Sequence, residues 1–148
     1  MGIIADSIVD DWLSSLPETD GIYPVIEKTR ADRDPKERIP AIIELGTSRD
    51  PRAVQPLIDC CRDQDPEIRL RAIAGLQNMR NGRSVEVLIE RLRDKRELYE
   101  TRKRAVVALA TIRSYRAIQE LKNTVVDPNE NAAIRSLIGW ELERVHIW

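Results

Sequence analysis

Three pairs of arginines recur along the chain, and they are the residues with the clearest capacity for binding chemistry. The pairs share the spacing Arg-x-x-Arg: Arg49 and Arg52, Arg80 and Arg83, Arg113 and Arg116. Guanidinium groups bind carboxylates and phosphates through two parallel hydrogen bonds. If the pairs lie in equivalent turns, they form one basic edge that suits an acidic partner or a nucleic-acid backbone. The structural alternative is that these cations stabilise the dipoles and free carbonyls at the carboxyl ends of helices.

Catalytic and metal chemistry have little support. His146 is the only histidine, whereas a zinc site needs about four clustered ligands, so we predict no metal and no cofactor. Cys60 and Cys61 are the only cysteines, and neighbouring residues on a helix point about 100° apart, which excludes a disulfide or CxxC pair between them. By their repeat positions we expect Cys61 to be buried, and Cys60 and Arg91 to be more exposed. With no catalytic cluster and no glycine-rich phosphate loop, we predict a protein that is not an enzyme.

Length and charge limit the remaining classes. The 148 residues suffice for one domain, and 42% of them are hydrophobic but only 4% aromatic, so the core must consist mainly of Ala, Leu, Ile and Val. The 24 Lys and Arg against 25 Asp and Glu give a net charge of -1, which argues against a dedicated nucleic-acid binder. No apolar run approaches the roughly 18 residues of a membrane span, and the N-terminus lacks the features of a signal peptide. We therefore predict a cytoplasmic protein with no membrane contact.

A second series of arginines shows that the chain is internally repeated. The series is Arg38, Arg69, Arg102 and Arg135, with offsets of 31, 33 and 33 residues. The same offsets relate Leu45, Leu76, Leu109 and Leu142, which we expect to be buried. Aspartates lie in the linkers that precede these arginines, so pairing between repeats is favoured over ligand binding as the role of the series.

Each repeat is predicted to contain two helices. Val54, Leu57, Ile58 and Cys61 have the spacing i, i+3, i+4, i+7 of one helix face, and equivalent residues recur in the later repeats. Asp, Asn, Ser, Gly and Pro mark the turns between the helices. We predict nine helices, in four hairpins followed by an unpaired helix. The units are a degenerate N-terminal unit 4–33, repeats 34–64, 65–96 and 97–129, and a C-terminal capping helix 130–148.

A period of 31 to 33 residues built of Asp-Pro, Arg, Ala-x-x-x-Leu and then Ala-Val-x-Pro-Leu-Ile resembles the HEAT-like repeats of the phycobilisome-lyase type. The resemblance covers roughly residues 20–145 and implies an all-α, right-handed α-α superhelix, a HEAT-like solenoid. It also implies that the second helices line a concave face, where polar side chains of mixed sign, among them Glu86 and Glu90, are candidates to contact a partner.

The tryptophans lie at the two ends, with Trp12 in the first predicted helix and Trp140 and Trp148 in the last. Because no second helix follows, we expect the last helix to contact a partner protein or a second copy of the chain, giving a homodimer; alternatively, the tail folds back over its own repeat. The leading prediction is a non-catalytic scaffold that binds a protein. The alternatives are an accessory subunit of a lyase or other enzyme, suggested by the resemblance alone, and a polyanion-binding protein that uses the arginine edge.

Overall fold

The computed structural model describes residues 19–146, which form eight α-helices, three short 3₁₀ segments and no strand. The helices are α2 (Tyr23–Lys28), α3 (Pro35–Ser48), α4 (Val54–Cys60), α5 (Pro66–Met79), α6 (Val85–Arg93), α7 (Tyr99–Ile112), α8 (Tyr115–Val125) and α9 (Ala132–Arg144). The all-α prediction is confirmed. Of the nine predicted helices, the first, which would contain Trp12, lies outside the described residues.

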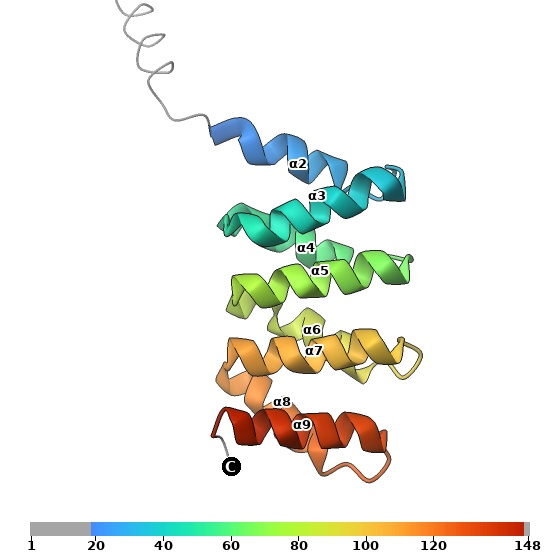
Figure 1. The fold of residues 1–148 in the computed structure, drawn as a ribbon, viewed down its shortest axis with the longest axis vertical. Coiled ribbons are helices and arrows are strands. Elements are labelled where there is room, and N and C mark those ends of the chain that lie inside the picture. Colours follow the sequence, from blue (N-terminus) through green and yellow to red (C-terminus); the bar gives the residue numbers. More distant parts are fainter. Residues whose placement is uncertain (1–18, 147–148) are drawn as a thin grey trace, which may run out of the picture.

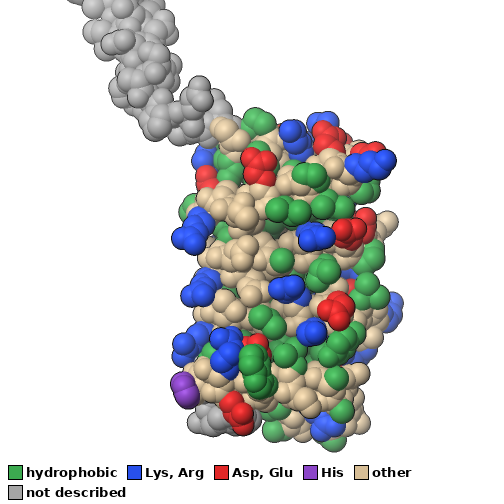
Figure 2. All heavy atoms as spheres, viewed as in Figure 1, with side chains coloured by type: hydrophobic (Ala, Val, Ile, Leu, Met, Phe, Trp, Pro, Cys, Tyr) green, Lys and Arg blue, Asp and Glu red, His purple; other side chains and the backbone are tan. Residues whose placement is uncertain are grey.

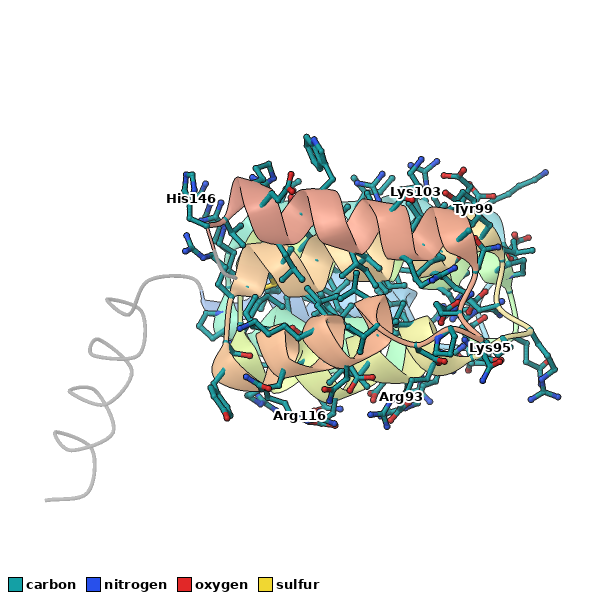
Figure 3. The ribbon with its side chains drawn as sticks, turned by 90° about the horizontal axis from the view of Figure 1, so that it is seen from below. Arg93, Lys95, Tyr99, Lys103, Arg116 and His146 are labelled. Carbon is teal, nitrogen blue, oxygen red and sulfur yellow. The ribbon has the colours of Figure 1, made fainter. Side chains whose placement is uncertain are left out.

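The helices are stacked in two layers. The first helices of the repeats, α3, α5, α7 and α9, lie side by side as successive rungs (Figure 1), and each contacts the next. The second helices, α4, α6 and α8, lie behind them, and a view along the stack separates the two layers (Figure 3). The first helices therefore all begin at one edge of the stack and all end at the other. The 3₁₀ segments η2 (Pro51–Ala53) and η3 (Gly82–Ser84) belong to the turns at this second edge.

Aspartate and proline explain where the first helices begin. The Asp34 carboxylate accepts a hydrogen bond of 2.8 Å from the amide of Lys36, and Asp65 accepts one of 2.9 Å from the amide of Glu67. The proline that follows each aspartate has no N–H, and none is needed in the first turn of a helix. At α9 the side chain of Asn131 takes the same capping role.

The core runs through the whole stack without interruption. Leu45, Leu76, Leu109 and Leu142, the repeating leucines, all have zero exposed surface. This result confirms the repeat register, because a shift of one residue would turn each of them by about 100° away from the core.

Two glycines allow α3 and α5 to approach each other closely. A Cβ atom added to Gly46 would lie 2.6 Å from the Cα of Gly75, and one added to Gly75 would lie 3.0 Å from the Cα of Gly46. The obstructing atoms belong to the backbone, so no change of side-chain rotamer can remove the clash. The packing of these two helices therefore depends on both residues being glycine.

We expect Gly46→Ala to lower the free energy of unfolding by about 1–3 kcal/mol, because α5 must move to accept the methyl group. Gly139→Ala in α9 is the matched control. An added Cβ there meets nothing within 4 Å, and alanine is favoured over glycine in a helix by about 0.5–1 kcal/mol. The control should therefore raise the stability in urea unfolding, and a gain from both substitutions would contradict the close approach.

Candidate functional site

The arginine series at the start of the first helices ties each repeat to the next. Arg38 donates to the carboxylate of Asp63 at 2.5 Å and to the carbonyl of Thr29 at 3.1 Å. Arg69 binds Glu97 through two hydrogen bonds of 2.7 and 2.8 Å. Both acids lie in the loop that leads into the following first helix. The Arg69–Glu97 pair therefore joins two repeats, whereas Arg38 and Asp63 lie near the two ends of the repeat 34–64 and Arg38 reaches the preceding unit through Thr29.

Arg102 repeats this arrangement with Glu130, at 2.7 Å, and also donates to the carbonyl of Leu92 at 2.9 Å. The predicted structural role of the series is therefore observed for Arg38, Arg69 and Arg102. The acids differ from those predicted, because they lie in the linker that follows each arginine and not in the one that precedes it, and two of them, Glu97 and Glu130, are glutamates. Arg135 holds the fourth position, and its Nε is buried with no hydrogen-bond partner among residues 19–146.

The paired carboxylates have lowered pKa values. Burial alone would raise the pKa of Glu97, but hydrogen bonds from Arg69, the Leu98 amide and Arg91 outweigh it and hold the pKa below the ordinary value of 4.5. The same holds for Glu130. Burial alone would raise its pKa, but hydrogen bonds from Lys95, Arg102 and the Asn131 amide outweigh this effect and lower the pKa. Ionised carboxylates therefore stabilise the folded chain.

We expect the stability of the protein to fall as the pH drops below about 4.5, where these glutamates bind protons in the unfolded chain before they do so in the folded one. The stabilisation by these two carboxylates is fully present above that pH, and it is lost as the pH falls towards their lowered pKa values in the folded chain. Urea unfolding at neutral and acid pH measures the loss. The variant Glu97→Gln lacks one of these groups, so its free energy of unfolding should change less between the two pH values than that of the wild type. An equal change in the variant and the wild type would contradict this assignment.

The six turn arginines divide into two rows with different surroundings. The first row lies at the start of the second helices. Each arginine of this row contacts the second helix of the preceding unit, always at the equivalent position of the repeat: Arg52 contacts Tyr23, Arg83 contacts Gln55, and Arg116 contacts Glu86. The Arg52 guanidinium lies 5.1 Å from the Tyr23 ring centre, and Arg116 lies 3.0 Å from Glu86. This row therefore joins neighbouring repeats.

Ion pairs also cover the outer surface of the second helices. Arg62 binds Glu90 through hydrogen bonds of 2.8 and 2.9 Å, and Arg93 binds Glu120 at 2.6 and 2.7 Å. Figure 3 shows Arg93 and Arg116 on this side. The candidates Glu86 and Glu90 are exposed as expected, but Glu86 already pairs with Arg116 of the next repeat and Glu90 with Arg62 of the preceding one, so a partner would have to compete with internal pairs.

The remaining row of arginines ends the first helices in an unusual backbone conformation. Arg49, Arg80 and Arg113 have φ angles of 55°, 50° and 58°, a left-handed region in which glycine is the usual residue at a helix end. His146, at the same offset of 33 residues, has a φ of 54°. Figure 2 shows Lys and Arg side chains along this edge of the stack, above the purple His146. The histidine is therefore a fourth member of the row that was not predicted from the sequence.

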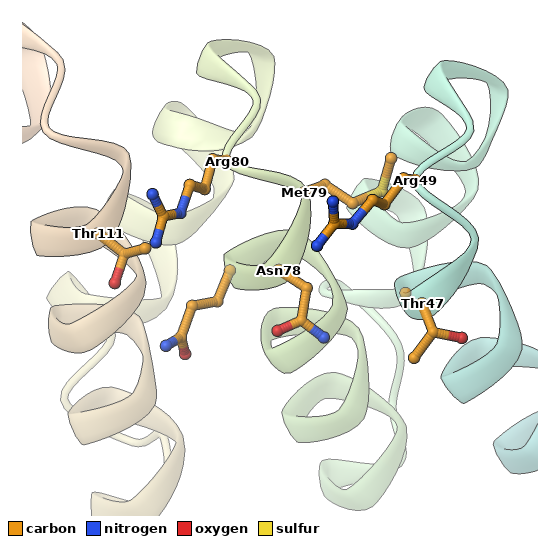
Figure 4. Close-up of a pocket in the computed structure, with 8 residues that line it drawn as sticks. Thr47, Arg49, Asn78, Met79, Arg80 and Thr111 are labelled. Carbon is orange, nitrogen blue, oxygen red and sulfur yellow. The ribbon is translucent and has the colours of Figure 1, made fainter.

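A groove of about 760 Å³ opens along this edge, between the carboxyl ends of α3, α5 and α7. Its polar lining includes Thr47, Gln77, Asn78 and Thr111, and Arg49 and Arg80 complete it. In Figure 4 Arg49 extends from its turn towards Met79 and Asn78, and Arg80 extends towards Thr111. Each of these arginines therefore reaches from its own repeat to the next first helix.

Thr47 and Thr111 donate to backbone carbonyls of their own helices, but other polar groups of this groove have no partner among the described residues. In the region from residue 19 to residue 146, the side chains of Arg49 and Arg80 have no hydrogen bond or ion pair. The Oε1 atom of Gln77 is buried and has no donor there either. By contrast, Arg113 donates to the carbonyl of Val145 at 3.2 Å. Arg49 and Arg80 are thus the arginines of the row that remain available to a ligand.

Comparison with known proteins establishes the family. A family model described as HEAT repeats matches residues 22–99, more than half of the chain. The chain belongs to the HEAT-repeat family. Among solved structures, human deoxyhypusine hydroxylase in complex with glycerol superposes with a TM-score of 0.75 at 18% identity, over 88% of this chain and 45% of that chain. This likeness shows the shared fold alone. No curated protein matches the sequence significantly.

The cysteines of this HEAT-repeat protein lie inside it. Cys61 has no exposed surface, as expected, and Cys60, which was expected to be more exposed, is also buried with 4% of its surface exposed. Its Sγ lies 3.9 Å from the carbonyl of Thr29, between the repeats. Burial raises the pKa of Cys60 to about 11 and also raises that of Cys61. Both thiols are therefore protonated at neutral pH and are poor nucleophiles.

Arg91 also differs from the prediction, because its side chain is only 17% exposed and pairs with Glu97 at 2.9 Å. Repeat alignment placed it on the surface, but the loop that carries Glu97 covers it. Over the described range, no group of three or more His, Cys, Asp or Glu could hold a metal ion. No helix within that range has both the length and the apolar content to cross a membrane.

Trp140, the candidate residue in α9, is exposed to solvent. Trp140 is 58% exposed, and the Arg144 guanidinium lies 5.8 Å from its ring centre. The other face of α9 is buried against α7 and α8 through Ile134, Ile138 and Leu142. Trp148 lies outside the described residues, and contact of this end with a second copy or a partner stays a prediction.

Proposed function

We propose that this HEAT-repeat protein is a non-catalytic, cytoplasmic scaffold that binds a partner protein along the edge where the first helices end. The observation that carries the proposal is the left-handed backbone of Arg49 and Arg80. A residue with a side chain costs about 1–2 kcal/mol in this conformation, whereas glycine adopts it freely. Interaction with the helix dipole offsets about 0.3–1 kcal/mol of that cost. Strain of this kind is often found at functional sites.

The distribution of ion pairs supports this edge over the other surfaces. On the second-helix side Glu86 and Glu90 are engaged with Arg116 and Arg62, while the guanidinium groups of Arg49 and Arg80 line an open groove. Arginine is enriched among the residues that dominate protein–protein binding energies. The net charge of -1 counts against a nucleic-acid partner.

The resemblance to repeats of the phycobilisome-lyase type supports a narrower form of the same proposal, in which the bound partner is an enzyme or its substrate protein and this chain is an accessory subunit. This form rests on analogy with the repeat type. Both forms require a partner that depends on the same edge.

The double variant Arg49→Gly/Arg80→Gly separates binding from folding. Glycine keeps the left-handed turns, so we expect the stability in urea unfolding to be unchanged or to rise by up to about 1 kcal/mol per site. Loss of both guanidinium groups should abolish capture of the partner from a cell extract, measured by quantitative mass spectrometry.

The matched control is Arg33→Ala/Arg96→Ala, which removes two exposed charges from loops at the opposite edge. It should leave the capture unchanged. If every captured protein is retained equally by wild type and by the glycine variant, the proposed edge is not the binding surface.

A further inference from the structure

We propose that the groove beside Arg49 and Arg80 binds an extended acidic segment of the partner, in which carboxylates recur about every third residue. This inference rests on the proposed function and specifies its ligand. The spacing of the arginines, the absence of acidic residues from the lining, and the unpaired amides inside the groove all favour such a ligand.

The repeat geometry sets the spacing of the carboxylates. Arg49 and Arg80 occupy equivalent positions at the ends of α3 and α5, which pack against each other. Packed helices lie about 8–10 Å apart, and the Gly46–Gly75 contact places this pair at the lower end of that range. An extended segment in the polyproline II conformation rises about 3.1 Å per residue with three residues per turn. Acidic side chains at positions i and i+3 therefore lie about 9 Å apart on one side of the segment, which matches successive arginines.

The charge of the groove favours an anionic ligand. None of the described residues that line it is acidic, whereas two of them are arginines without an ion pair. The nearby carboxylate of Asp50 is held by Arg52 at 2.7 Å. A ligand carboxylate would thus meet a guanidinium with all of its donors free, the condition for a two-bond contact.

The amides inside the groove favour a peptide over a nucleic-acid backbone. Gln77 has a buried Oε1 atom without a donor, and Asn78 lies beside it with its side chain in the groove (Figure 4). The peptide backbone carries both N–H donors and C=O acceptors, and a turn of the Gln77 amide would let Oε1 accept a peptide N–H. A phosphodiester backbone offers acceptors alone and would leave that oxygen unpaired.

Fluorescence anisotropy with labelled synthetic peptides and the full-length chain tests the proposal. Three peptides with a Ser and Pro background carry Glu at every third position, the same number of Glu in one contiguous run, or Gln at every third position. We expect the spaced Glu peptide to bind about tenfold more tightly than the contiguous one, a difference of about 1.4 kcal/mol, and the Gln peptide not to bind. Arg80→Gly should lower the affinity for the spaced Glu peptide, and Arg96→Ala should leave that affinity unchanged.

A single-stranded oligonucleotide of equal charge provides the competing arm. Equal affinity for the spaced and contiguous peptides, tighter binding of the oligonucleotide, or no effect of Arg80→Gly would each overturn the inference. If the peptides fail while capture of a partner still depends on Arg49 and Arg80, the acidic spacing is wrong and the scaffold proposal stands. If the capture is also independent of these arginines, both fail.

Discussion

Arg102→Ala is expected to lower the free energy of unfolding by about 3–5 kcal/mol, the loss typical when one partner of a buried ion pair is removed. The Arg102 side chain is 8% exposed and that of Glu130 is 4% exposed. Without the guanidinium, the carbonyl of Leu92 loses its donor, but Glu130 keeps the ion pair with Lys95 and the hydrogen bond from the Asn131 amide. The expected loss is therefore near the lower end of the range, and urea unfolding measures it.

Arg104→Ala on the same helix is the control for this substitution. Arg104 is exposed and has no ion pair with any residue from 19 to 146, so its loss should change the stability by less than about 0.5 kcal/mol. The double variant Arg102→Met/Glu130→Leu replaces both charges with apolar groups and should recover much of the stability. Equal effects of Arg102→Ala and Arg104→Ala would show that the inter-repeat pair contributes nothing.

Leu76→Ala should lower the free energy of unfolding by about 2–5 kcal/mol, because it leaves a cavity in a closely packed core. Leu76 has no exposed surface and lies in α5, which packs on α3, α4 and α7. Thermal and urea unfolding should both show the loss. Leu76→Met, which nearly conserves volume, should cost less than about 1.5 kcal/mol. A loss as small for alanine as for methionine would place Leu76 outside the core.

The sequence by itself determined the repeat and its buried side. The offsets of 31, 33 and 33 residues correctly predicted Leu45, Leu76, Leu109 and Leu142 as core residues. The helices themselves follow from local rules, since an apolar stripe and a cap such as Asp34 or Asp65 act within one or two turns. Such information lies in neighbouring residues and needs no knowledge of the other repeats.

Only the tertiary structure decided which polar groups meet. Arg80 and Arg83 belong to one Arg-x-x-Arg pair, yet Arg83 reaches Gln55 of the preceding repeat while Arg80 remains in the groove. The pairing of Arg69 with Glu97 spans 28 residues. These contacts depend on the rotation and separation of adjacent helices.

Close packing between repeats likewise appeared only in three dimensions. Gly46 and Gly75 bring α3 and α5 together, and Cys60 is enclosed between repeats although its aligned positions are more open. Side-chain periodicity defines the face that a helix buries, because it depends on the geometry of one helix. The partners of a residue on that face depend on how several helices pack, which no single periodic pattern specifies.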